Sequence, residues 1–214
     1  MPTSFLQPSW VKSTKSTRFQ QLKKFFNGKD VLDIGCAVGY QKDDWMHKNI
    51  VSVARSVYGL DLDNDSVEEI RRMGYAVCQG NAQNFSLDRK FNLIHAGELI
   101  EHLDNPGGFL ESVKEHLTED GVLLITTPNA LRVSNFIYAA TGGLKVNVEH
   151  TCWFCETTIA TLLERKGFEV VEVGYLKHET FNWLRRMLLS LRALLLPDRV
   201  AWNTLYVVAK IKAF

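Results

Sequence analysis

A Glu-x-x-Glu-His run near the middle of the chain holds the side-chain types that bind metal ions or accept protons. Glu98, Glu101 and His102 stand at i, i+3 and i+4, so a helical turn there would put all three on one face. Two carboxylates beside an imidazole are costly unless a cation or a substrate proton joins them. A later histidine, His150, precedes the aromatic pair Trp153-Phe154 and is a fourth candidate. These residue types predict either a divalent-cation centre or a proton-accepting site.

Glycines and polar side chains also stand at the ends of three apolar runs in the first half of the chain. Asp33, Gly35 and Gly39 lie at the end of the first run and in the loop after it, where glycines let the backbone approach a ligand closely. Asp61 ends the second run, and its carboxylate could accept hydrogen bonds from both hydroxyls of a ribose. Asn81 follows the third run, and its amide could read an adenine edge. Together they predict a site for a nucleoside-containing ligand.

These residues can meet only if the strands before them end at one edge of a sheet. Short apolar runs alternate with helix-like segments, which predicts a doubly wound α/β fold with a seven-stranded, mostly parallel sheet and helices on both faces. In such a sheet the ligand binds beyond the carboxyl ends of the strands, at the switch point of the strand order. The expected strands span residues 31–34, 57–61, 75–78, 91–96, 121–127, 168–173 and 205–211. The expected helices span residues 11–26, 66–73, 106–117 and 157–166.

Length and composition predict one globular domain over residues 1–214, in which residues 1–28 form a helical entry. The hydrophobic share of 46% and the charged share of 23% are ordinary for a soluble protein. Residues 130–150 and 177–203 do not fit the alternation and are expected to be insertions that bind the substrate. The first residues lack the pattern of a secretory signal, so we expect a cytoplasmic location.

The order of these motifs resembles that of the class I S-adenosylmethionine-dependent methyltransferases, from Asp30 to Lys210. The first motif of that family has an acidic residue with glycines two and six positions later, as at Asp33, Gly35 and Gly39. Ala37 stands where many members have another glycine. A nicotinamide-dependent dehydrogenase would need Gly-x-Gly-x-x-Gly here, which this sequence lacks. The resemblance implies that S-adenosylmethionine is surrounded by Asp33, Gly35 and Gly39 at the methionine, Asp61 at the ribose, and Leu62, Asn81 and Ala82 at the adenine.

The Glu-x-x-Glu-His run, the Thr-Pro-Asn turn at residues 127–129 and the later histidine resemble two branches of that family. These are the ubiquinone-biosynthesis O-methyltransferases and the small-RNA 2′-O-methyltransferases, which hold a divalent cation beside the methyl acceptor. The resemblance implies that the metal ligands are Glu98, Glu101, His102 and His150. The spacing from His150 to the following aromatic residues departs from both branches. Carboxylate and imidazole ligands suit Mg²⁺ or Mn²⁺ and leave Zn²⁺ and Fe²⁺ open.

A second interpretation of the same run involves no metal. Related methyltransferases of sugars and small molecules have a Glu-His pair here that caps the next helix or acts as acid and base. His102 or His150 is then the best candidate base, because a neutral imidazole can take a hydroxyl proton near neutral pH. On either interpretation the catalytic residues are Glu98, Glu101, His102 and His150. Three other histidines are expected to be structural: His47, His95 and His116.

The resemblance predicts an S-adenosylmethionine-dependent O-methyltransferase acting on a hydroxyl of a small molecule, a glycan or a lipid-linked acceptor. Lys and Arg total 25 against 24 for Asp and Glu, so no cationic field indicates a nucleic-acid partner. RNA 2′-O-methylation is therefore kept only as an alternative. The other alternative is a protein that binds S-adenosylmethionine without catalysis. The complete set of Glu98, Glu101 and His102 argues against it.

Residues 181–196 are rich in leucine and are predicted to form an amphipathic helix at the entrance to the acceptor pocket. Arg185, Arg186 and Arg192 interrupt the apolar run too often for a membrane span. The segment is still apolar and cationic enough for a peripheral membrane contact. A lid over the site or a seam between two copies is an equal alternative, and the sequence leaves the oligomeric state open.

Overall fold

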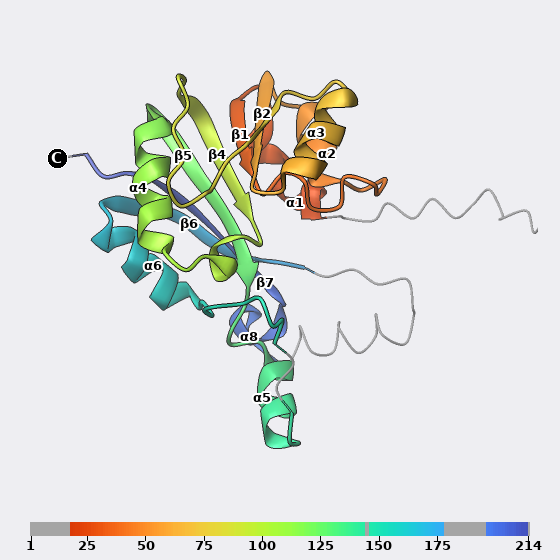
Figure 1. Cartoon of the computed structure of the whole chain (residues 1–214). Helices are drawn as coiled ribbons and strands as arrows, with labels where there is room; N and C mark the ends of the chain where they lie inside the picture. Colours follow the sequence, from red (N-terminus) through yellow and green to blue (C-terminus); the bar gives the residue numbers. More distant parts are fainter. Residues whose placement is uncertain (1–17, 144–145, 178–195, 214) are drawn as a thin grey trace, which may run out of the picture.

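A seven-stranded sheet runs through the molecule in the order β3-β2-β1-β4-β5-β7-β6 (Figure 1). The structure is a computed structural model and describes residues 18–143, 146–177 and 196–213. Its strands are β1 (Asp30–Ile34), β2 (Ser56–Asp61), β3 (Val77–Gln79), β4 (Phe91–Gly97), β5 (Leu117–Pro128), β6 (Phe168–Leu176) and β7 (Thr204–Ile211). All seven expected strands are present, although β3 begins later and β5 earlier than expected. The predicted doubly wound, mostly parallel fold is confirmed.

The sheet reverses its strand order between β1 and β4. Strands β1 to β5 pair in parallel, whereas β7 lies between β5 and β6 and is antiparallel to both. Ile34 at the end of β1 pairs with Ala96 near the end of β4. The loops after these two strands therefore leave the sheet side by side, at the switch point where such folds bind ligands.

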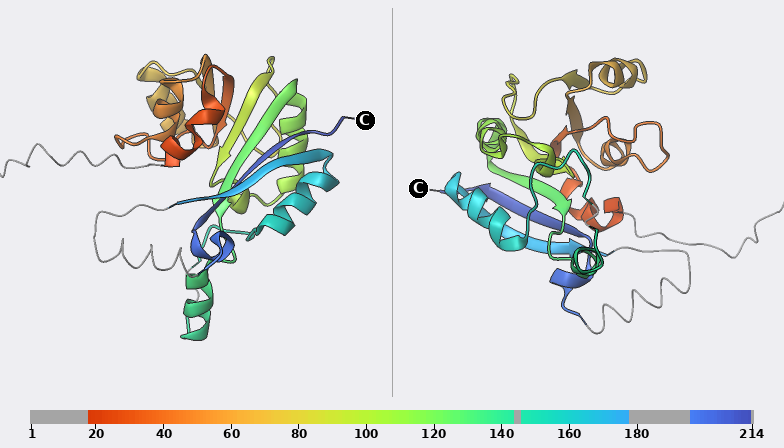
Figure 2. Two further views of the ribbon diagram at one scale, coloured as in Figure 1. Left: turned by 180° about the vertical axis from the view of Figure 1, so that it is seen from behind. Right: turned by 60° about the horizontal axis from the view of Figure 1, so that its bottom comes forward.

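Helices cover both faces of the sheet (Figure 2). They are α1 (Arg18–Phe26), α2 (Met46–Val51), α3 (Asn64–Arg72), α4 (Pro106–His116), α5 (Val133–Ala140), α6 (Glu156–Arg165) and α8 (Asp198–Ala201), with a 3₁₀ turn η1 (Ile100–His102). Neighbouring strand residues point to opposite faces: Leu32 and Ile94 pack in the core beneath α4 and α6, and Val31 and Leu93 in the core beneath α1 and α2. Each fully buried side chain of this size stabilises the fold by about 1.5 to 3 kcal/mol.

Two of the sequence expectations fall partly on residues that the structure does not describe. Helix α1 forms the second half of the expected helix 11–26, and the segment 181–195 lies outside the described residues altogether. The expected insertion 130–150 contains α5, which stands beyond the end of β5 (Figure 1). Among the described helices, none has the length and apolar character needed to cross a membrane.

The antiparallel strand β7 brings both ends of the expected insertion 177–203 to one place. Thr204, the first residue of β7, pairs with Leu176 at the end of β6 and with Pro128 at the end of β5. The amide of Asn129 also donates to the carbonyl of Asn203 at 2.7 Å. The chain therefore leaves the sheet for this insertion, and returns from it, at the edge where β5 ends.

Candidate functional site

The loop after β1 has the backbone shape that its glycines predict. Gly35 and Gly39 have φ angles of +77° and +78°, in the left-handed region that other residues rarely adopt. The Gly35 amide donates to the carbonyl of Leu60 at 2.8 Å, which holds the loop across the end of β2. The loop therefore presents its backbone at the edge of the sheet.

Asp61 lies where this loop meets the end of β2. Its Oδ2 accepts a hydrogen bond from the Ala37 amide at 2.8 Å, and its Oδ1 accepts one from the Asp63 amide at 3.1 Å. A carboxylate has about four lone-pair positions, so two remain for a ligand. These two bonds fix the direction of the carboxylate before a ligand arrives.

The expected adenine residues surround the neighbouring strand ends. The Leu62 side chain is 66% exposed, and Val38 in the first loop is 82% exposed, so two apolar side chains stand uncovered here. Asn81 Oδ1 accepts from the Gln83 amide at 2.9 Å. Ala82 is buried and packs in the core. The uncovered apolar side chains suit a flat ring laid against the ends of β2 and β3.

Asp33 is buried beneath the first loop and is bound by two histidines. Its Oδ1 accepts from Nδ1 of His95 at 2.7 Å, and its Oδ2 accepts from Nδ1 of His47 at 2.8 Å. Burial alone would raise the pKa of Asp33, but the two hydrogen bonds outweigh burial and lower the pKa to about 2. Asp33 is only 3% exposed, so it supports the loop from below. Sequence reasoning treated the two histidines as isolated structural residues and missed their shared partner.

On the other side of the switch point, the structure brings Glu101, His102 and His150 together. One ligand atom from each side chain lies within 4.8 Å of the other two. The rings of His102 and His150 are 4.6 Å apart between centroids, in an edge-to-face arrangement. Glu101 is 1% exposed, and its Oε1 has no hydrogen-bond partner among the described residues. A buried carboxylate oxygen without a partner, beside two imidazoles, is the arrangement that a cation or a shared proton completes.

Two threonines hold this group in place; the sequence analysis included Thr127 only as part of the Thr-Pro-Asn turn and did not identify Thr151. Thr127 near the end of β5 donates from its hydroxyl to Oε2 of Glu101 at 2.9 Å. Thr151 donates from its amide to the carbonyl of Glu101 at 2.9 Å and from its hydroxyl to that of Leu103 at 2.9 Å. Because Thr151 follows His150 directly, these bonds hold that histidine against η1 although it is distant in sequence.

Glu98 is placed differently from the sequence expectation. The helical turn covers only Ile100–His102, and Glu98 precedes it with a φ of +52°, so the expected single helical face for Glu98, Glu101 and His102 is wrong. Glu98 is not one of the three residues whose ligand atoms converge. Its Oε2 lies 3.6 Å from Nη2 of Arg18 on α1. The first described helix therefore reaches the same edge of the sheet.

When nothing is bound, the surroundings disfavour a charge on Glu101 and on His150. Burial, with a contribution from the carboxylate of Glu98, raises the pKa of Glu101 to about 7. Burial and the neighbouring His102 lower the pKa of His150. A cation bound here would reverse the shift at Glu101, because an adjacent positive charge favours the ionised carboxylate.

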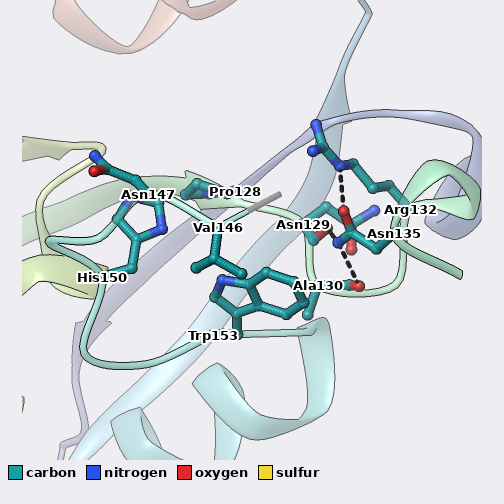
Figure 3. Close-up of a pocket in the computed structure, with 9 residues that line it drawn as sticks. All are labelled: Pro128, Asn129, Ala130, Arg132, Asn135, Val146, Asn147, His150 and Trp153. Atoms are coloured by element: carbon teal, nitrogen blue, oxygen red, sulfur yellow. Dashed lines mark hydrogen bonds between the residues drawn. The ribbon is translucent and has the colours of Figure 1, made fainter. Parts of the chain in front are cut away.

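A cavity of about 220 Å³ opens beside His150 (Figure 3). It lies between the end of β5, the start of α5 and the loop that bears His150. The described residues that line it are Pro128, Asn129, Ala130, Arg132, Asn135, Val146, Asn147, His150 and Trp153. His150 belongs to both the converging group and the cavity, so a molecule in the cavity can reach the group.

Comparison with known proteins identifies the family from the sequence, and solved structures share the fold. The family model for the methyltransferase domain matches residues 10–173. A "probable S-adenosylmethionine-dependent methyltransferase" of Mycolicibacterium smegmatis is 31% identical over 155 residues, covering 71% of this chain and 56% of that protein. A ubiquinone biosynthesis O-methyltransferase of Glaesserella parasuis is 30% identical over 114 residues, covering 48% of this chain and 46% of that protein. The chain thus spans about half the length of the curated relatives it matches.

Two solved structures illustrate the likeness in fold. A S-adenosylmethionine-dependent methyltransferase from Clostridium acetobutylicum superposes with a TM-score of 0.60 at 12% identity, over 91% of this chain and 88% of that chain. The glycopeptide N-methyltransferase MtfA, in complex with S-adenosylmethionine, superposes with a TM-score of 0.62 at 14% identity, over 91% of this chain and 86% of that chain.

Proposed function

Because the chain belongs to the class I S-adenosylmethionine-dependent methyltransferases, we propose that it methylates a hydroxyl oxygen of a small molecule, a glycan or a lipid-linked acceptor. The observation that carries this proposal is the group Glu101, His102 and His150, which adjoins a cavity. A hydroxyl is a weak nucleophile until a base or a cation assists it. The group holds imidazoles that can act as a base, and a carboxylate that can bind a cation together with them. The match to a ubiquinone biosynthesis O-methyltransferase also supports oxygen as the accepting atom.

The strand order supports direct methyl transfer between two halves of the site: the cofactor half at the loop after β1, and the acceptor half at the segment after β4. The loop that holds Gly35 and the segment that holds Glu101 follow the paired strands β1 and β4. A methyl donor on the first loop would therefore face an acceptor beside the second segment. The acceptor oxygen attacks the methyl carbon, the electrons of the carbon–sulfur bond return to sulfur, and the hydroxyl proton passes to a base. Since the sulfonium is already reactive, alignment of the two molecules is the main task of the protein.

The residues of the group fit a divalent cation, although its identity stays open among Mg²⁺, Mn²⁺, Zn²⁺ and Fe²⁺. Glu101 offers the buried Oε1 without a partner, and His102 and His150 each offer a ring nitrogen. The hydrogen bond from Thr127 to the other oxygen of Glu101 orients the carboxylate, as partners of metal ligands usually do. A bound cation would lower the pKa of the acceptor hydroxyl. Without a cation, His102 or His150 takes the hydroxyl proton directly.

Removal of divalent cations should lower methyl transfer by about a hundredfold or more, the scale expected for the loss of a metal ligand set. The experiment treats the purified protein with a chelator and then adds back each of the four ions in turn. Elemental analysis before and after treatment gives a readout that does not depend on activity. Full activity in excess chelator, with no retained metal, would leave the group as an acid–base site alone.

Asp61→Ala should weaken the binding of S-adenosylmethionine by roughly tenfold to a hundredfold, because charge-assisted hydrogen bonds to the ribose are lost. Calorimetry with S-adenosylmethionine and its demethylated product measures the effect. Asp63→Ala is the matched control: Asp63 caps α3, accepting from the amides of Asp65 and Ser66, so its loss should affect stability and leave affinity unchanged. Equal weakening in both variants would contradict the assignment of the ribose to Asp61.

A further inference from the structure

The cavity beside His150 has a wall that is rich in hydrogen-bond donors. The residues that line it include Arg132, Asn147 and Trp153, whose side chains carry guanidinium, amide and indole N–H groups. Of the described residues that line the cavity, none is an aspartate or a glutamate. A wall of donors without carboxylates is suited to a ligand that brings its own acceptors, and most of all to an anion.

Arg132 is held in place by a chain of buried amides. Its Nε donates to Oδ1 of Asn135 at 2.7 Å, and Nδ2 of Asn135 donates to the carbonyl of Ala130 at 2.9 Å. Asn129 beneath them is 1% exposed and donates to the carbonyls of Arg199 and Trp202. Figure 3 shows the bond from Arg132 to Asn135 at one end of the cavity. The guanidinium is therefore oriented before any ligand binds.

The two terminal nitrogens of this guanidinium have no acidic partner in the part of the chain that the structure describes. Ion pairs there occupy Arg18, Arg55, Arg71 and Arg199, but no carboxylate lies within ion-pair distance of Arg132. Helix α5 begins directly after Arg132 and has no acidic residue in its first turn, so no carboxylate of that turn offsets the positive end of the helix dipole. A guanidinium presents paired N–H groups that match a carboxylate or a phosphate.

We propose that the methyl acceptor bears a carboxylate or phosphate group that Arg132 binds, while the hydroxyl to be methylated lies at His150. The inference rests on the proposed function and names the chemistry of its acceptor. In Figure 3 the indole of Trp153 and the side chain of Val146 lie between His150 and Arg132. These two side chains give an apolar surface for the body of the acceptor, between a hydroxyl at one end and an anion at the other. The volume of about 220 Å³ suits a single ring with its substituents.

The test uses pairs of related probes in which one member carries the anionic group and the other is neutral. One pair is 4-hydroxybenzoate and 4-hydroxybenzamide, and the second is glucose 6-phosphate and glucose. Binding of each probe to the full chain is measured by saturation-transfer NMR and titration. S-adenosylhomocysteine, the demethylated product of S-adenosylmethionine, is present throughout. At least one anion should bind roughly tenfold or more tightly than its neutral partner. The pair that shows the difference distinguishes a carboxylate from a phosphate.

Arg132→Gln should abolish this preference for the anion, and Arg132→Lys should retain part of it. Arg199→Gln is the matched control, because the guanidinium of Arg199 already pairs with Glu156 at 2.9 Å. Thermal unfolding and S-adenosylhomocysteine binding verify that each variant is folded. Equal binding of charged and neutral probes by the wild type, or an undiminished preference in Arg132→Gln, would overturn the proposal. Charge-dependent binding without methyl transfer to any hydroxyl would instead count against the proposed function alone.

Discussion

Glu101→Gln is expected to lower the rate of methyl transfer by about a hundredfold or more while the affinity for S-adenosylmethionine stays unchanged. The substitution keeps the size of the side chain and an oxygen that can accept from Thr127. It removes the negative charge that a cation, or a protonated imidazole of His102 or His150, requires. Both interpretations of the group therefore predict the same loss, which steady-state kinetics with calorimetry of cofactor binding would measure.

The control for this prediction is the same substitution at Glu149. Its side chain is 73% exposed, and its Oε2 lies 3.9 Å from Nδ1 of His102, so the pair is screened by water. Glu149→Gln should change the rate by no more than a few-fold. Comparable losses in the two variants would mean that any negative charge near His102 supports the rate, and that Glu101 has no specific role.

Asp33→Asn is expected to lower the free energy of unfolding by about 3 kcal/mol, the scale for breaking a buried charge network. The carboxylate accepts from His47 and His95 at once, and an amide offers only one oxygen for the two donors. Denaturant unfolding, followed by circular dichroism, gives the change. Asp30→Asn on the same strand is the control, because Asp30 pairs with Arg55 at the surface and should contribute much less.

The effect of Asp33 should also depend on pH. Its pKa in the folded protein is about 2, below the ordinary 3.8, so its stabilising effect is present above pH 3.8 and is lost as the pH falls towards 2. The wild type should therefore lose more stability than Asp33→Asn across that range. Parallel stability profiles for the two proteins would show that the carboxylate is not held in its ionised form.

Much of the backbone geometry at the expected cofactor site could be predicted because its signals are local. Gly35 and Gly39 adopt the left-handed backbone that their residue type favours, and Asp61 is the last residue of β2. The boundary between α4 and β5 could not be predicted as well: α4 ends at His116 and β5 begins at Leu117, and that early start depends on the pairing of Leu117 with Phe91. Sequence periodicity does not report such a pairing between distant segments.

The acceptor half was harder to predict because contacts between distant segments build it. The position of His150 depends on the bonds of Thr151 to η1, and the position of Arg132 depends on Asn135. Glu98 shows the limit of helical spacing, since its φ of +52° takes it out of the turn that the spacing implied. Residue types in this half predicted a group of metal-binding or proton-accepting side chains, of which Glu101, His102 and His150 converge, but the partners of these side chains became visible only in the folded chain.

The antiparallel strand β7 has a consequence for how this protein can diversify. The segment between β6 and β7 starts at Leu176 and returns at Thr204, and these two residues pair with each other beside the end of β5. Changes in the segment between them can leave the pairings of these strands in place, because both of its ends are fixed beside the end of β5, next to the cavity. The cofactor loop lies on the other side of the switch point and is not constrained by such changes. On the proposed function, we expect that evolution, or an engineer exchanging this one segment, can change the acceptor while the residues of the cofactor side stay as they are.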